Sequence, residues 1–142
     1  MENLPKQPQK IKRPALAAGF KEYINYYMVR KRWNQNRLAE CARLNQPQLN
    51  KMINGKVYNM SIDTLACLCL ALQLTLPEAE DLLARAERAF SPASELHTAY
   101  KELINQYAVM PFERINDEKM LDEADRFLQV NGLQTLPNCY SY

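Results

Sequence analysis

The sequence has few of the residues that metal sites and many active sites need. Its 142 residues contain one histidine, His97, and four cysteines, Cys41, Cys67, Cys69 and Cys139. The cysteines have neither zinc-ligand spacing nor the spacing of a disulfide framework, and Cys67 and Cys69 would point apart on a helix. We therefore expect no metal and no cofactor, and we expect reduced thiols that serve mostly as small apolar packing groups.

Further absences narrow the class of protein. No apolar run approaches the roughly 18–20 residues that span a bilayer. The first residues, MENLPKQPQKIKRP, lack an apolar signal core. We expect no membrane insertion and a cytoplasmic location. No Ser-Lys, Ser-His-Asp or Cys-His combination has a recognisable catalytic spacing, so an enzyme is the weakest hypothesis and His97 is better explained as a surface or helix-packing residue.

Acidic residues are scarce in the first part of the chain. Up to Met60 there are twelve lysines and arginines and three acidic residues, a formal balance of +9, whereas the rest has six basic and thirteen acidic residues, a balance of −7. Solvation of helix faces explains most of the acidic part and less of the basic part. The asymmetry favours a basic end that faces nucleic acid and an acidic end that faces solvent or a partner.

Apolar residues recur at helical spacing, and no strand pattern or internal repeat occurs. Helices are predicted over about residues 20–32, 35–42, 46–54, 76–89, 92–107 and 117–130, with a further one that begins after Ser61 and includes Leu72. The expected amino-terminal caps are Asn34, Asn45, Ser61, Thr75 with Glu78 as a capping box, Ser91 and Asn116. Gly55 is expected in the left-handed conformation after the third helix.

These elements predict an all-α protein with four segments. Residues 1–18, with three prolines and four basic residues, are expected to form a flexible basic arm. Residues 19–90 hold the first five helices and 91–132 form a two-helix acidic extension. A tail of residues 133–142 follows.

The segment 34–56, NQNRLAECARLNQPQLNKMINGK, contains two short helical patterns with a tight break between them. One side of each is apolar, with Leu38, Ala39 and Ala42 in the first pattern and Leu49, Met52 and Ile53 in the second. Two short helices that share a small core across a three- or four-residue connection form a helix-turn-helix. The other side of the second helix has no carboxylate, so a polyanion can approach it.

This segment resembles the helix-turn-helix of the Cro and phage-repressor (XRE-type) family. The resemblance lies in Gln35-x-x-Leu-Ala, the later Asn-Gly-Lys, and Ser61-Ile62-Asp63-Thr64-Leu65 with Leu72, and it covers about residues 20–88. It implies a five-helix, lambda-repressor-like domain that binds double-stranded DNA, commonly as a homodimer on a two-fold symmetric operator. The expected function is therefore that of a sequence-specific transcriptional regulator of prokaryotic or phage type.

The resemblance also implies residue roles. Base readout is expected from Gln46, Pro47, Gln48, Asn50 and Lys51. Glutamine can pair with adenine and lysine with guanine. Contacts with the DNA backbone are expected from Gln35, Asn54, Lys56 and Asn59.

Nonspecific phosphate contacts are expected from a set of basic residues in the first part of the chain, namely Lys10, Lys12, Arg13, Arg30, Lys31, Arg32 and Arg37. Two positions depart from the family pattern. Arg43 stands where the turn usually has glycine, and so must tolerate strain or a shifted turn. Pro47 replaces a residue that often hydrogen-bonds a base, and offers only apolar contact.

A second class of function stays open at this point. An antitoxin or adaptor can retain a helix-turn-helix while its acidic carboxy-terminal helices bind a protein partner. The excess of acidic residues between 91 and 131 supports this alternative.

Overall fold

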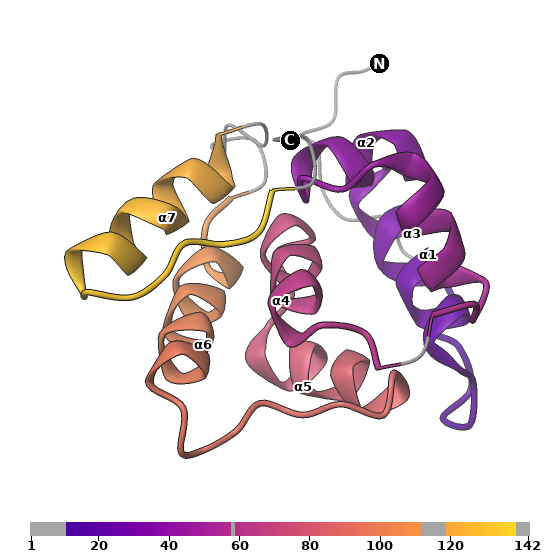
Figure 1. Ribbon diagram of the computed structural model, residues 1–142. Coiled ribbons are helices and arrows are strands. Elements are labelled where there is room, and N and C mark those ends of the chain that lie inside the picture. The colour runs from indigo at the N-terminus through magenta and orange to yellow at the C-terminus, as the bar shows by residue number, and fades with distance from the viewer. Residues whose placement is uncertain (1–10, 58, 112–118, 139–142) are drawn as a thin grey trace.

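A computed structural model of the protein describes residues 11–57, 59–111 and 119–138. Within them the chain forms seven helices and no strand, as Figure 1 shows. The helices are α1 (Phe20–Lys31), α2 (Gln35–Cys41), α3 (Gln46–Ile53), α4 (Ile62–Ala71), α5 (Leu76–Arg85), α6 (Glu95–Ala108) and α7 (Met120–Val130). The prediction of an all-α fold, with five helices followed by two, is confirmed. No helix in the described part of the chain is long and apolar enough to cross a membrane.

α4 lies at the centre of the molecule, between α1–α3 on one side and α6 and α7 on the other (Figure 1). It contacts α2, α5, α6 and α7. Every residue of α4 except Asp63 is buried, which is why its sequence IDTLACLCLA is apolar on all sides rather than on one stripe. Its two cysteines, Cys67 and Cys69, are buried packing groups that form no disulfide, as predicted.

Polar contacts fasten helices on both sides to α4. Lys31 of α1 is buried, and its Nζ donates to the backbone oxygen of Ala71 at 3.0 Å. On the opposite side, the Tyr100 hydroxyl of α6 donates to Asp63 Oδ1 at 2.7 Å. Burial, together with this hydrogen bond to a carboxylate, raises the pKa of Tyr100. α4 is thus joined to both halves of the chain by apolar packing and by hydrogen bonds.

The ends of α5 and α6 differ from the prediction. α5 ends at Arg85 and not near residue 89, because Glu87 takes a positive φ of 61° and turns the chain. α6 begins at Glu95 and not at residue 92, because Ser94 rather than Ser91 caps it and accepts the N–H of His97 at 3.0 Å. Asn116, the predicted cap of α7, lies outside the described residues, but α7 begins at Met120 with Lys119 at its N-cap and not near residue 117. The other predicted caps, Asn34, Asn45, Ser61 and Thr75 with Glu78, are confirmed.

Six helices end in one backbone motif, in which a residue after the helix is left-handed and two backbone hydrogen bonds close the last turn. The left-handed residues are Arg32, Arg43, Gly55, Gln73, Glu87 and Gly132. The sequence has only three glycines, so four of these ends use a side-chain-bearing residue at a cost of about 1 kcal/mol each. At such positions the side chain is a candidate for a contact that offsets the strain, in addition to the role of the backbone in ending the helix.

The chain before α1 is held in place near residues 14–18, although the sequence predicts a flexible arm there. Tyr23 donates its hydroxyl to the backbone oxygens of Pro14 and Ala15 at 3.1 and 3.3 Å. Arg85 of α5 lies over the Tyr23 ring, and its Nη1 donates to the backbone oxygens at 16 and 18. This part of the predicted arm therefore contacts α1 and α5.

Candidate nucleic-acid interface

α3 presents a polar face to solvent and an apolar face to the core. Leu49, Met52 and Ile53 are buried. Gln46, Pro47, Asn50 and Lys51 are exposed, and Gln48 is half-buried. This division matches the helical pattern expected from the sequence. The exposed face carries amide groups and one ammonium group and no carboxylate, so it can offer hydrogen bonds to base edges without repelling phosphate.

Side-chain amides on this face form hydrogen bonds with one another. Gln46 Nε2 donates to Asn36 Oδ1, which joins the start of α3 to the start of α2. Asn54 Nδ2 donates to the backbone oxygen of Asn50 at 2.9 Å and to its side-chain oxygen at 3.1 Å. Asn36 was not among the predicted site residues. Its position directly after Gln35, at the exposed start of α2, is the signal that points to it.

The turn between α2 and α3 places Arg43 in the left-handed conformation, with φ 61°. The backbone N–H of Arg43 donates to the backbone oxygen of Glu40, and that of Leu44 donates to the backbone oxygen of Ala39 at 2.8 Å. Leu44 is buried, and Asn45 then caps α3 by accepting the N–H of Gln48. The strain expected from arginine at this position is therefore present, and the turn keeps a regular motif despite it.

Arg43 does not face solvent. Its side chain is 11% exposed, and its guanidinium contacts two carboxylates of α7. Nη1 donates to Asp125 Oδ2 at 2.7 Å, and Nη2 donates to Asp122 Oδ1. Burial lowers the pKa of Arg43, but the hydrogen bonds to the two carboxylates outweigh it, and the pKa is raised overall. Nothing in the sequence around Arg43 indicates these partners, which lie some eighty residues further along the chain.

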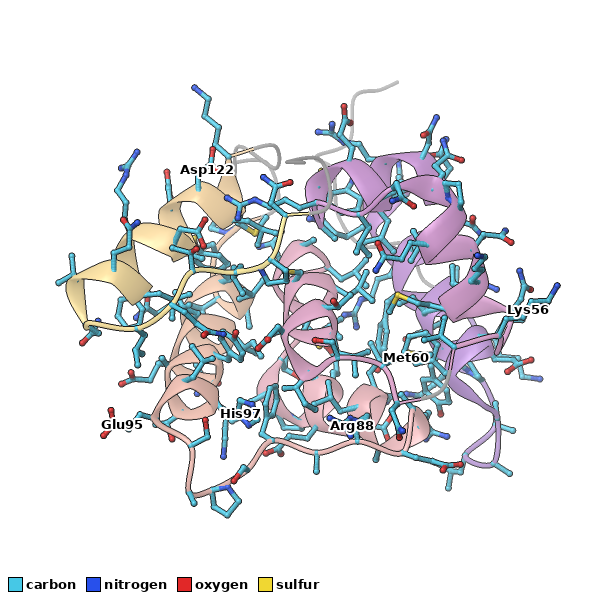
Figure 2. The ribbon with its side chains drawn as sticks, in the orientation of Figure 1. Lys56, Met60, Arg88, Glu95, His97 and Asp122 are labelled. Carbon is cyan, nitrogen blue, oxygen red and sulfur yellow. The ribbon has the colours of Figure 1, made fainter. Side chains whose placement is uncertain are left out.

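Basic residues near α3 fall into two groups. Arg32, Lys51 and Lys56 are exposed, and Figure 2 shows Lys56 directed away from the helices. Arg30 and Lys31 turn inward, so the structure does not support the phosphate contacts predicted for them.

Contacts inside the molecule occupy both of these inward side chains. Arg30 makes two hydrogen bonds with Glu78 of α5, at 2.7 and 3.0 Å, and lies 4.9 Å from the centre of the Tyr27 ring. Lys31 donates to the Ala71 backbone, and its Nζ lies 3.9 Å from the centre of the Trp33 ring. A side chain bound in this way cannot reach phosphate without breaking these contacts.

The other residues predicted to contact phosphate differ in how exposed they are and in whether they have partners within the protein. Arg37 of α2 pairs with Glu40 at 2.9 Å and lies 5.8 Å from the centre of the Trp33 ring. Gln35 is half-buried, and Asn59 is exposed with a φ of 52°. Lys12 and Arg13 are exposed, whereas Lys10 lies outside the described residues.

His97, the single histidine, packs in the structure. It lies in the first turn of α6 (Figure 2), stacked on Tyr100 and edge-on to Phe90. Its Nδ1 accepts the backbone N–H of Ser91 at 2.9 Å, which agrees with the prediction of a packing residue. Among the residues that the structure describes, no three histidine, cysteine or acidic side chains are grouped to hold a metal ion.

Comparison with known proteins identifies one matching family. Residues 23–84 match the family model described as the Cro/C1-type HTH DNA-binding domain. This span begins within α1 and ends within α5, so it contains the α2–α3 pair and all of α4. No curated protein and no solved structure matches the chain.

Proposed function

We propose that this protein is a sequence-specific transcriptional regulator, because residues 23–84 of the chain match the model of the Cro/C1-type HTH DNA-binding domain. It binds double-stranded DNA as a homodimer on a two-fold symmetric operator, and α3 enters the major groove.

The exposed face of α3 is the observation that carries this proposal. The major groove admits one α-helix, and its base edges offer hydrogen-bond acceptors and donors. Gln46 and Lys51 lie on the exposed face and have the chemistry to pair with adenine and guanine edges. Asn50 and Gln48 flank them, and Pro47 offers apolar contact to a thymine methyl group.

The backbone of the DNA is contacted by groups around this helix. In the proposal, Gln35, Arg37, Asn54, Lys56 and Asn59 lie against phosphates on either side of the groove. Lys10, Lys12 and Arg13 add contacts from the amino-terminal segment. Arg32, exposed between α1 and α2, joins this set, whereas Arg30 and Lys31 stay with their partners inside the protein.

A homodimer follows from the small size of the reading element. α3 has eight residues, and a single such helix reads only a few base pairs. Two copies related by a two-fold axis place their recognition helices in successive turns of the major groove, about 34 Å apart. The operator then has two half-sites of opposite orientation.

Selection from DNA with a randomised central region tests the proposal. The purified full chain is expected to enrich duplexes with a two-fold symmetric consensus, and its affinity for them is expected to fall as the salt concentration rises. No enrichment, together with co-purification of a second protein on α6 and α7, would favour the antitoxin or adaptor function instead.

A further inference from the structure

Arg43 joins the helix-turn-helix to the last helix of the chain. The turn from 42 to 45 connects α2 with α3, and Arg43 is its second residue. Its guanidinium leaves the turn toward α7, where it contacts Asp122 and Asp125. Figure 2 shows Asp122 at the start of α7, on the same upper side of the molecule as α2.

Asp125 is also bound from a second direction. Its Oδ2 accepts from Arg43, and its Oδ1 accepts the backbone N–H of Leu136 at 2.8 Å. Leu136 is buried. The segment that contains it runs back along α7 and past the upper end of α4 toward α2 (Figure 1). One carboxylate thus holds together the turn before α3, the helix α7 and the segment that follows α7.

Because Arg43 lies in the turn directly before α3, its contacts with α7 can affect the position of α3. Two residues after Arg43, Asn45 caps α3. Between them, the buried Leu44 fixes the path of the backbone. A displacement of the Arg43 backbone therefore moves the start of α3, where Gln46 lies.

We propose that Arg43 is a positioning residue for DNA recognition: its ion pairs with Asp122 and Asp125 hold α3 in its reading orientation and make DNA affinity depend on α7. This inference rests on the proposed function, since it assumes that α3 reads DNA. It assigns α7 a role in recognition without contact between α7 and DNA.

A direct contact between Arg43 and phosphate is a different explanation, and it predicts effects of opposite sign. If Arg43 bound phosphate, removal of the two carboxylates would free its guanidinium and reduce the negative charge near DNA. Affinity would then rise. If the carboxylates position α3 through Arg43, affinity falls on their removal even though the protein becomes less negative.

Removal of these ion pairs is expected to leave the fold intact, because other contacts hold α6 and α7 in place. Gln73, at the end of α4, donates through Nε2 to the backbone oxygens of Tyr107 and Met110 at 3.0 and 3.2 Å. The Tyr107 hydroxyl donates to the backbone oxygen of Met120 at 3.0 Å. Met120, Leu121, Ala124 and Leu128 are also buried. DNA affinity and stability are therefore separable measurements.

The test compares the double variant Asp122→Asn, Asp125→Asn with Glu123→Gln in the full-length chain. Asparagine at 125 keeps an acceptor for Leu136 but removes the charge that binds Arg43. Glu123 is an exposed acidic residue on the same helix, so its variant shows the effect of removing one negative charge from α7 without removing a partner of Arg43. The probes are a duplex enriched by the wild-type chain and a scrambled duplex of the same composition, with thermal unfolding followed by circular dichroism.

We expect the double variant to bind the enriched duplex about fivefold more weakly than wild type, with a smaller change on the scrambled duplex. Glu123→Gln is expected to bind both as tightly as wild type or slightly more tightly. Arg43→Gln is expected to reproduce the weaker binding, and its combination with the double variant to add little more. Arg43→Lys, which keeps a charge at 43, is expected to recover part of the affinity.

Unchanged or increased affinity of the double variant overturns the inference, as does an equal decrease in Glu123→Gln. If the double variant does not fold, Arg43→Gln and Arg43→Lys decide the question: equal affinity of both for the enriched duplex overturns the inference. Failure of the wild-type chain to enrich any duplex instead contradicts the proposed function. The two failures are therefore distinct.

Discussion

α3 and α7 are two short amphipathic helices that use their polar sides differently. α3 has eight residues and α7 has eleven, and each buries an apolar stripe against the core. On α3 the polar side chains face solvent, and hydrogen bonds join amides of α2 and α3 to each other. On α7 two of the acidic side chains hold an arginine of the turn before α3.

The difference shows that the sign of a charge in sequence does not tell where that charge acts. The sequence predicts that the acidic extension faces solvent or a partner, yet Asp122 and Asp125 are bound to Arg43. In the same way, Arg30 and Lys31 belong to the basic part but are bound inside the protein. The charges open to a polyanion are therefore fewer than the sequence balance indicates.

Leu65→Ala is expected to have the largest effect, because it removes the packing that the two regions share. Leu65 of α4 is fully buried, and such truncations cost about 2–5 kcal/mol. Urea unfolding should show one transition, shifted to lower urea. The control is Val130→Ala on α7, whose side chain is 85% exposed and whose change is expected to stay within about 0.5 kcal/mol. Two separate transitions in wild type would contradict a shared core.

Gln46→Ala and Lys51→Ala test the polar side of α3. Each is expected to weaken binding to the enriched duplex by about 1–3 kcal/mol, with little change in melting temperature, because the side chains are exposed. Matched controls on the other region are Gln129→Ala and Lys119→Ala, which are exposed at the two ends of α7. DNA titration on enriched and scrambled duplexes measures the effect. Equal decreases in the α3 variants and in their controls would remove α3 from the reading role.

Glu78→Gln tests the ion pair that holds the basic residue Arg30 inside the protein, in contrast to the basic residues that are exposed to solvent. Burial raises the pKa of Glu78, but the hydrogen bonds from Arg30 and from the Thr75 backbone outweigh it, and the pKa lies below its usual 4.5. A carboxyl group with a lowered pKa stabilises the fold above its unfolded pKa, and this stabilisation is lost as pH falls through the folded pKa. Wild type should therefore lose stability below pH 4.5 more steeply than the variant does.

The measurement is the free energy of unfolding in urea over a pH series, for wild type and Glu78→Gln side by side. Curves that run parallel through the acid range would mean that the pair with Arg30 does not stabilise the fold.

The double variant Lys12→Ala, Arg13→Ala tests whether the two exposed basic residues before α1 contact phosphate. Affinity for enriched and scrambled duplexes is expected to fall by about the same factor, because phosphate contacts carry no sequence information. The slope of log affinity against log salt should decrease by about 0.9 for each phosphate that the variant no longer neutralises. A changed preference between the two duplexes, or an unchanged slope, would contradict this role.

Glu87→Gly is expected to have the smallest effect, and it isolates what arginine does at the equivalent position 43. Both residues have a φ of 61°, but Glu87 is exposed at the end of α5. Relief of the left-handed strain should stabilise the protein by about 0.5 kcal/mol without a change in DNA affinity. A lower melting temperature would show that the Glu87 side chain has a stabilising contact.

Local sequence patterns predicted much of the fold and the exposed face of α3. The caps at Asn34, Asn45, Ser61 and Thr75 and the apolar spacing within each helix depend on residues a few positions apart, which the sequence displays directly. The end of α5 was missed, because a glutamate at 87 gives no signal for a left-handed residue. The division between 90 and 91 stays a prediction.

Contacts between distant residues could not be predicted in this way. Arg43 with Asp122 and Asp125, Arg30 with Glu78, and Lys31 with Ala71 depend on how helices pack, and each pairing has many alternatives in a chain with 34 charged side chains. These contacts decide which basic residues are open to DNA. The exposed face of α3 could therefore be predicted from the sequence, whereas the set of basic residues around it that are open to DNA could be identified only from the structure.

Mapping of backbone amide signals by nuclear magnetic resonance, during titration of the full chain with its enriched duplex, tests the central claim most directly. We expect the largest shifts at the start of α2, along 46–56, and at Arg43 and Leu44, with small shifts on the exposed side of α7 at Glu123 and Gln129. Shifts concentrated on α6 and α7, with those of α3 unchanged, would contradict DNA reading by α3.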